Sequence, residues 1–212
     1  MFMAGVMAEA THAQVGMNMD IMSRYVWRGA DFGNSPSIQP EITYGYGGLE
    51  IGSWAAVATT GNPDGYEVDW FANYTFETGS GDFSLYLIDY TFPVPGTGDY
   101  FSSEAHFLEA GAGVSELADT PLSFFGGMFL TNDEDHSIYL ELAYDLKAVG
   151  FVLGMTPSES AMYGTSGPAI IHTGITAGKA LHFSESLEIG LSTSIILNPH
   201  SEDLFFLVGL GL

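Results

Sequence analysis

Charged and amide side chains recur at alternate positions along this chain, and their types and spacing could support chemistry. If they share one enclosed face, opposite charges can pair, and a ring of like charges can select permeating ions by sign. Structural pairing and ion selection both stay open from the sequence. The candidates are Asp20, Arg24, Arg28, Glu41, Glu67, Asp69, Asn73, Glu109, Glu141 and Glu188.

Histidines offer a second kind of chemistry, nucleophilic catalysis, which needs an imidazole within hydrogen-bond reach of a serine and of an orienting acid. The candidates are His106, His136, His172, His182 and His200. No serine lies in a recognised catalytic motif, and the grouping HFSES, from His182 to Ser186, falls in a short predicted turn. We therefore expect no enzyme activity, no cofactor and no resident metal.

Composition excludes several classes of partner. The 212 residues include 26 acidic and 4 basic side chains, giving a formal net charge of -22. Such a charge repels phosphate backbones, so we expect no nucleic-acid partner. The chain has no cysteine, which excludes disulfides and thiolate metal sites.

The first residues resemble the end of a secretory signal peptide. Residues 1–13 form a short apolar run that ends in small residues, with Ala8/Ala10 and Thr11/Ala13 as pairs typical of a cleavage site. We assign this segment as a signal-peptide remnant and residues 14–212 as a single domain. A frayed terminus is the alternative.

Alternation of apolar and polar residues with period two, which is typical of β-strands, dominates the rest of the chain. In YEVDWFANYTFE, for example, Val68 and Trp70 alternate with Asp69 and Asn73. Turn-forming residues bound each run. The predicted strands are 15–27, 38–46, 49–57, 66–77, 83–90, 105–115, 122–130, 137–146, 149–156, 169–181, 186–197 and 204–212.

The connections between these runs are of two alternating kinds. Long connections such as TNDEDH and NPHSED alternate with short ones such as GG and KA. An even-stranded barrel of a bacterial outer membrane has this arrangement. No apolar run approaches the ~20 residues of a membrane helix. The sequence thus predicts an all-β, antiparallel, up-and-down transmembrane barrel of about twelve strands, and a soluble β-barrel or sandwich is the alternative.

The stretch SRYVWRGADFGNSPSIQPEITYGYGGLEIGSWAAV, residues 23–57, is similar to the opening of the TorF-type porins, a bacterial outer-membrane family of largely uncharacterised members. The similarity rests on a Tyr-x-aromatic-Arg-Gly box, a Pro-x-x-Gln-like second strand and a Gly-x-Trp third strand. The matching residues are Tyr25, Trp27, Arg28, Gly29, Pro36, Gln39, Gly52 and Trp54. The resemblance implies a pore-forming role and names no solute.

A membrane barrel with apolar faces toward lipid would enclose the ten candidate residues in an acidic lumen that favours cationic or neutral solutes. Arg24 and Arg28 would share one strand face and meet the carboxylates, since arginine facing lipid at mid-membrane costs roughly 2–4 kcal/mol. Aromatic residues near strand ends, including Tyr25 and Trp27, would lie at headgroup level. We expect an outer-membrane porin. The alternatives are a barrel enzyme acting on lipid or peptide and a non-conducting structural barrel.

The acidic outer loops have two interpretations. Their carboxylates could hold Ca²⁺ or Mg²⁺ that bridges lipopolysaccharide, or they could carry solvated charge. The residues concerned are Asp133, Glu134, Asp135, Glu202 and Asp203. The expected partners are outer-membrane lipid and small solutes, with divalent cations as the open case.

Overall fold

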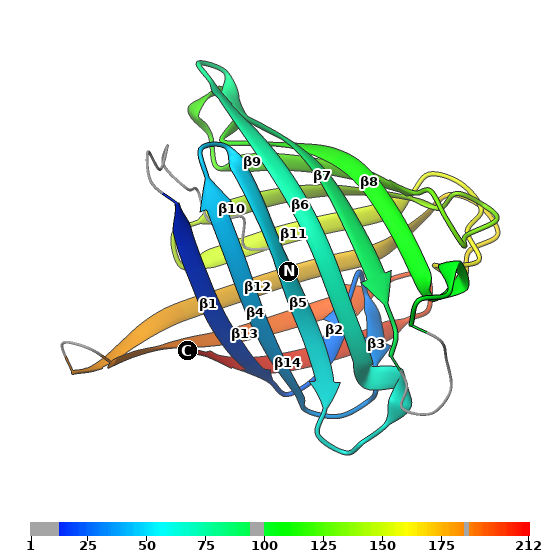
Figure 1. Ribbon diagram of the computed structural model, residues 1–212, viewed down its shortest axis with the longest axis horizontal. Coiled ribbons are helices and arrows are strands. Elements are labelled where there is room, and N and C mark those ends of the chain that lie inside the picture. Colours follow the sequence, from blue (N-terminus) through cyan, green and yellow to red (C-terminus); the bar gives the residue numbers. More distant parts are fainter. Residues whose placement is uncertain (1–12, 94–99, 185–186) are drawn as a thin grey trace.

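The computed structural model describes residues 13–93, 100–184 and 187–212. Twelve strands form one closed antiparallel barrel, and two short strands form a separate hairpin (Figure 1). The predicted all-β antiparallel barrel is confirmed, including its number of strands. Residues 1–12, which hold nearly all of the predicted signal remnant, lie outside the described residues.

Each barrel strand pairs with the barrel strands that precede and follow it, and β1 closes the ring by pairing with β14. Closure pairs backbone groups that an open sheet would expose at its edges. The barrel strands are β1 (Gln14–Met22), β4 (Ser37–Tyr46), β5 (Leu49–Ala58), β6 (Tyr66–Thr78), β7 (Gly81–Thr91), β8 (His106–Ser115), β9 (Leu122–Phe129), β10 (Ile138–Leu146), β11 (Val149–Thr156), β12 (Ala169–Ser184), β13 (Leu187–Asn198) and β14 (Asp203–Gly211).

Short helical turns lie only in the connections of the described chain: η1 (Pro63–Gly65), η2 (Ser103–Ala105) and η3 (Leu117–Asp119). None of the helices among the described residues has the length and hydropathy that membrane crossing requires. Two-residue turns join β4 to β5 and β10 to β11 at one end of the barrel, which we call the short-loop end. The longer connections, such as residues 157–168, lie at the opposite, long-loop end (Figure 1).

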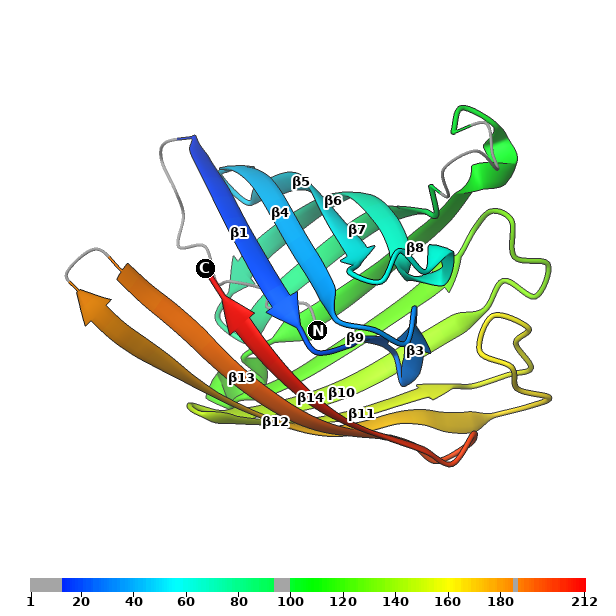
Figure 2. The same cartoon turned by 90° about the horizontal axis from the view of Figure 1, so that it is seen from below.

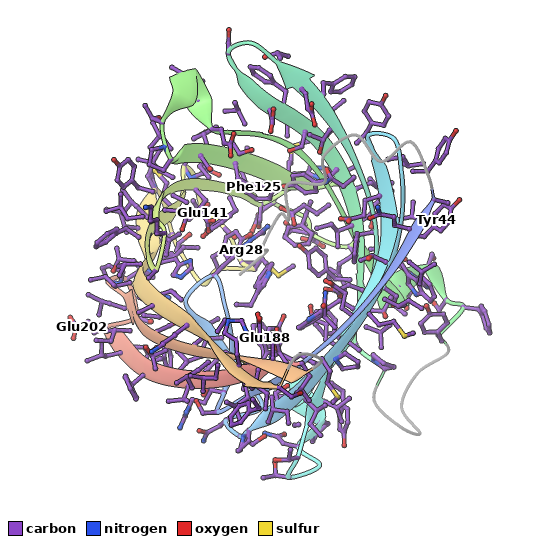
Figure 3. The ribbon with its side chains drawn as sticks, turned by 90° about the vertical axis from the view of Figure 1, so that its left-hand side faces the viewer. Arg28, Tyr44, Phe125, Glu141, Glu188 and Glu202 are labelled. Carbon is purple, nitrogen blue, oxygen red and sulfur yellow. The ribbon has the colours of Figure 1, made fainter. Side chains whose placement is uncertain are left out.

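Successive side chains of the barrel strands point alternately outward and inward. On β14, Phe206 is 65% exposed whereas its neighbour Leu207 is 3% exposed. Exposed large apolar side chains recur in this way on the barrel strands other than β8, and Tyr44 points away from the barrel in Figure 3. The outer surface is therefore largely apolar, and most acidic side chains of the strands point inward.

The predicted first strand, 15–27, is too long, and this part of the prediction is wrong. β1 ends at Met22, and the chain then forms a hairpin from β2 (Tyr25–Trp27) and β3 (Ala30–Phe32). We call residues 25–32 the lumen hairpin, because it lies inside the ring of barrel strands toward the long-loop end (Figure 2). The sequence predicted a strand end and a loop here.

The turn of the lumen hairpin explains why the strand breaks. Both central residues have positive φ, 48° at Arg28 and 81° at Gly29, as in the type I′ turns that suit two-residue hairpins. Tyr25 and Trp27 still alternate, but they face the barrel interior rather than lipid, and Tyr25 is buried. Their predicted place in an aromatic belt at headgroup level is therefore wrong.

We predict that Gly29→Ala lowers the free energy of unfolding by at least about 2 kcal/mol, because alanine is strained at positive φ. A Cβ at Gly29 would also lie 2.0 Å from the carbonyl oxygen of Ile171. Denaturant unfolding in detergent, followed by tryptophan fluorescence, measures the loss.

Gly47→Ala is the matched control, because Gly47 has φ +58° and a Cβ added there would meet no atom within 4 Å. It should cost only the backbone strain, about 1–2 kcal/mol. Equal losses in the two variants would contradict the docked position of the hairpin turn.

Candidate functional site in the barrel lumen

The tip of the lumen hairpin is fixed against the barrel wall. Asn198 of β13 donates a hydrogen bond from Nδ2 to the Gly29 carbonyl oxygen at 3.3 Å. Ile171, whose backbone approaches Gly29, is the extra residue at a register shift between β11 and β12, and its side chain is buried. A β-bulge and a glycine turn together allow the close approach.

The guanidinium of Arg28 is enclosed by a carboxylate, a phenol and two aromatic rings. Its Nη2 donates to both carboxylate oxygens of Glu109 in β8, at 2.8 and 2.9 Å, and its Nη1 donates to Tyr163 Oη at 2.6 Å. The ring centroids of Trp27 and Tyr139 lie 4.4 and 4.3 Å from Cζ. Arg28 is 8% exposed and Glu109 is 0% exposed. The predicted inward arginine therefore lies in a buried ion pair.

Two tyrosines complete the contacts of this ion pair. Tyr90 Oη donates to Glu109 Oε2 at 2.7 Å. Tyr163 comes from the β11–β12 connection, where its backbone N–H donates to Ser160 Oγ at 3.0 Å. Burial raises the pKa of Tyr163 to about 12. Its hydroxyl is therefore neutral near pH 7 and accepts the hydrogen bond from Arg28.

Aromatic side chains fill the space around the lumen hairpin. Trp27 packs edge-on against Tyr90 and Phe129, with ring centroids 5.6 and 6.5 Å apart. Tyr25 packs against Trp54 of β5 at 5.2 Å. Trp54 is one of the residues that carry the sequence resemblance, as are Tyr25 and Trp27, so much of that motif builds the hairpin and its seat.

Glu67 and Asp69 of β6 lie on the inner face beside the lumen hairpin, and both are buried. Asp69 is paired with Trp54 across β6 and β5, and Trp54 packs against Tyr25 of the hairpin. These two predicted residues therefore contribute to the wall on which the hairpin lies.

A second polar cluster lies next to Arg28 on β10 and β12. Tyr139 Oη donates to Glu141 Oε2 at 2.6 Å and lies 3.0 Å from His172 Nδ1. Because the phenol has a single proton, which Glu141 accepts, the His172 nitrogen is the donor in the second bond. The sequence prediction missed Tyr139, although it lies two residues before Glu141 and so shares its face.

Four other predicted residues lie on the inner face away from the ion pair. Glu41 accepts a hydrogen bond from Asn18 Nδ2 at 3.1 Å, while Asp20 is exposed and Asn73 is half-buried. These three lie on β1, β4 and β6.

Glu188, the fourth, lies near the short-loop end of β13 and pairs with His182 Nδ1 at 2.8 Å, and both side chains are more than half exposed. Figure 3 shows Glu188 and Glu141 at different parts of the wall, with Arg28 between them. The structure therefore gathers Arg28, Glu109, Glu67 and Asp69 around the hairpin, places Glu141 in the adjacent cluster and leaves Asp20, Glu41 and Glu188 spread along the lumen wall.

The predicted placement of Arg24 on one strand face with Arg28 is wrong. Arg24 follows the end of β1, directly precedes the lumen hairpin and pairs with Asp31 of β3. The cause is the chain reversal at Arg28, which brings Asp31 back beside Arg24.

The five candidate histidines have their polar contacts with carboxylates, a tyrosine and backbone carbonyls. Both ring nitrogens of His106 are occupied, Nδ1 by Asp89 Oδ2 at 2.8 Å and Nε2 by the Tyr100 carbonyl oxygen at 2.7 Å. His136 and His200 contact the carbonyl oxygens of Phe129 and Gly164. These contacts account for the orientation of each imidazole, and none of them is with a serine hydroxyl.

Two of the acidic loop residues support the loop backbone. Asp133 Oδ2 accepts from the Ser137 N–H at 2.5 Å, and Asp135 Oδ2 accepts from the Ala161 N–H at 2.8 Å. Across residues 13–93, 100–184 and 187–212, no group of three or more histidine, cysteine or acidic side chains is arranged to hold a metal ion.

The Gcw_chp family model, described as a bacterial protein of unknown function, matches residues 7–153. The chain belongs to this family. The Gcw_chp match includes the lumen hairpin and Glu109, whereas Tyr163, Ile171 and Asn198 lie beyond it. No curated protein matches the chain.

We predict that Arg28→Met lowers the free energy of unfolding by about 3–5 kcal/mol, because Glu109 is left as an uncompensated buried charge. The double variant Arg28→Met/Glu109→Gln should recover much of this loss. Denaturant unfolding in detergent measures both.

His182→Gln is the control, since the side chains of His182 and its partner Glu188 are 71% and 56% exposed and surface ion pairs contribute at most about 1 kcal/mol. A double variant that is as unstable as Arg28→Met would contradict the pairing account.

Proposed function

We propose that this protein is an outer-membrane barrel whose acidic lumen forms a path for small cationic or neutral solutes, and that the lumen hairpin, in the position described here, closes this path at the long-loop end. The observation that carries the proposal is the hairpin docked inside a closed barrel whose inner wall carries carboxyl groups. The similarity of residues 23–57 to TorF-type porins supports a pore.

The membrane part of the proposal rests on closure and on the outward apolar rows. A sheet can span lipid only when its backbone groups are paired around a ring. Exposed leucine, isoleucine and phenylalanine side chains cover the outside of strands such as β7, β13 and β14, where a water-soluble protein would rarely expose so large an apolar area.

The preference for cations follows from the inward side chains. Glu109 neutralises Arg28 within the ion pair. The inner wall beyond this pair keeps the carboxyl groups of Asp20, Glu41 and Glu188, and a lumen lined by acids favours cations over anions.

A non-conducting structural barrel is the second candidate. It is favoured by the extent to which Arg28 is buried and hydrogen-bonded, since this anchors the hairpin firmly. Neither candidate assigns the chain a catalytic role.

We predict that phospholipids with brominated acyl chains quench Trp70 and leave Trp27 and Trp54 nearly unaffected. Trp70 is 53% exposed on the outer surface, whereas Trp54 packs against Tyr25 and Trp27 against Tyr90 in the lumen. Three variants, each retaining one tryptophan, are reconstituted in vesicles and measured by fluorescence. Strong quenching of Trp54 with no quenching of Trp70 would contradict the assignment of the outer and inner faces of the barrel.

We predict that replacing residues 24–35 by Asn-Gly opens a cation-selective conductance in planar bilayers, whereas the unaltered protein conducts little. Met22 and Ser37 are paired across β1 and β4, so a two-residue turn can join Ser23 to Pro36. The reversal potential under a salt gradient gives the selectivity.

Arg24→Lys, which keeps the hairpin and a cation beside Asp31, is the control and should behave as the unaltered protein. If the shortened variant is folded but shows no conductance, the result would favour the non-conducting structural barrel. Anion selectivity would contradict the acidic path.

A further inference from the structure

Both lysines of the chain lie at the short-loop end. The chain has four basic residues, of which Arg24 and Arg28 belong to the hairpin region inside the barrel. Lys147 lies in the β10–β11 turn and Lys179 in β12. The basic side chains outside the lumen are therefore confined to one rim of a protein with a net charge of -22.

The two lysines are neighbours across the sheet. The Gly178 N–H donates to the Ala148 carbonyl oxygen at 3.0 Å. Ala148 directly follows Lys147, and Gly178 directly precedes Lys179. One backbone hydrogen bond thus links the positions next to both lysines.

Lys179 belongs to the outer face, because it alternates with the exposed Ile175 on the same strand and is itself exposed. The nearby carboxylates lie on the inner face. Asp145 approaches Gly150 there, and Glu188 pairs with His182. The two lysine charges are therefore not neutralised by these acids.

The depth of Lys179 matches that of lipid headgroups. Tyr144, Phe151 and Ile175 form one cross-strand row on the outer face, and aromatic residues mark the boundary between acyl chains and headgroups. Lys179 is four residues past Ile175, roughly 13 Å along the strand. At the usual strand tilt its backbone is roughly 10 Å beyond the boundary, and the flexible lysine side chain can extend back to the lipid phosphates.

We infer that Lys147 and Lys179 form a binding site for the headgroup of an anionic phospholipid. This inference rests on the proposed membrane barrel, in which the short-loop end faces the periplasm and hence the phospholipid leaflet. The exposed side chain of Leu146 beside Lys147 gives the first part of the acyl chain an apolar surface. A phosphate placed between two ammonium groups is held by charge complementarity.

The test uses the full chain in vesicles of equal phosphatidylglycerol and phosphatidylethanolamine, transferred to mild detergent. Mass spectrometry then measures the two lipids that remain bound. We expect phosphatidylglycerol to be enriched, by about fivefold for each lysine. Lys147→Gln/Lys179→Gln should abolish the enrichment, and Lys147→Arg/Lys179→Arg should keep it.

The matched control is Asn34→Asp/Ser201→Asp, which makes the same change in net charge at exposed positions of the long-loop end. It should retain the enrichment, and a loss equal to that of the glutamine variant would overturn the site. Equal retention of both lipids by an inserted, unaltered barrel overturns this inference alone. Failure to insert, seen as unquenched Trp70, overturns the membrane barrel as well.

Discussion

The ion pair between Arg28 and Glu109 determines how the interior of this barrel is organised. A guanidinium removed from water loses several kcal/mol of hydration, and a single carboxylate does not restore that loss. Here the phenols of Tyr163 and Tyr90 supply the remaining hydrogen bonds, and the faces of Trp27 and Tyr139 enclose the charge. The pair therefore joins a hairpin, three barrel strands and one long loop.

This arrangement divides the lumen into two unlike parts. Around the hairpin, buried aromatic rings make a core of the kind found in water-soluble proteins. Elsewhere the wall carries exposed or half-buried polar groups, such as Asp20 and Asn73. Twelve strands give a diameter between the filled barrels of eight strands and the open pores of sixteen. A single hairpin can occupy such a lumen.

The strands could be predicted because the outer and inner faces of each strand differ in polarity, as Trp70 and Asp69 illustrate. The hairpin could not be predicted, because Tyr25 and Trp27 alternate in the same way whether they face the outer surface or the inside of the barrel. The contacts of Arg28 with Glu109 and Tyr163 span 81 and 135 positions, and spacing along the chain carries no information at that range. Tyr139 could have been predicted from the sequence, since it lies two residues before Glu141 and therefore shares its strand face.

The attachment of the lumen hairpin limits how it can move. The residues at its two flanks, Met22 and Ser37, sit opposite each other on adjacent strands of the wall. Because both are held in the sheet, the segment is tethered twice at nearly one place on the rim. The hairpin cannot leave as an independent body, and if its contacts with Glu109 and Tyr163 were broken it would stay attached to the rim at Met22 and Ser37.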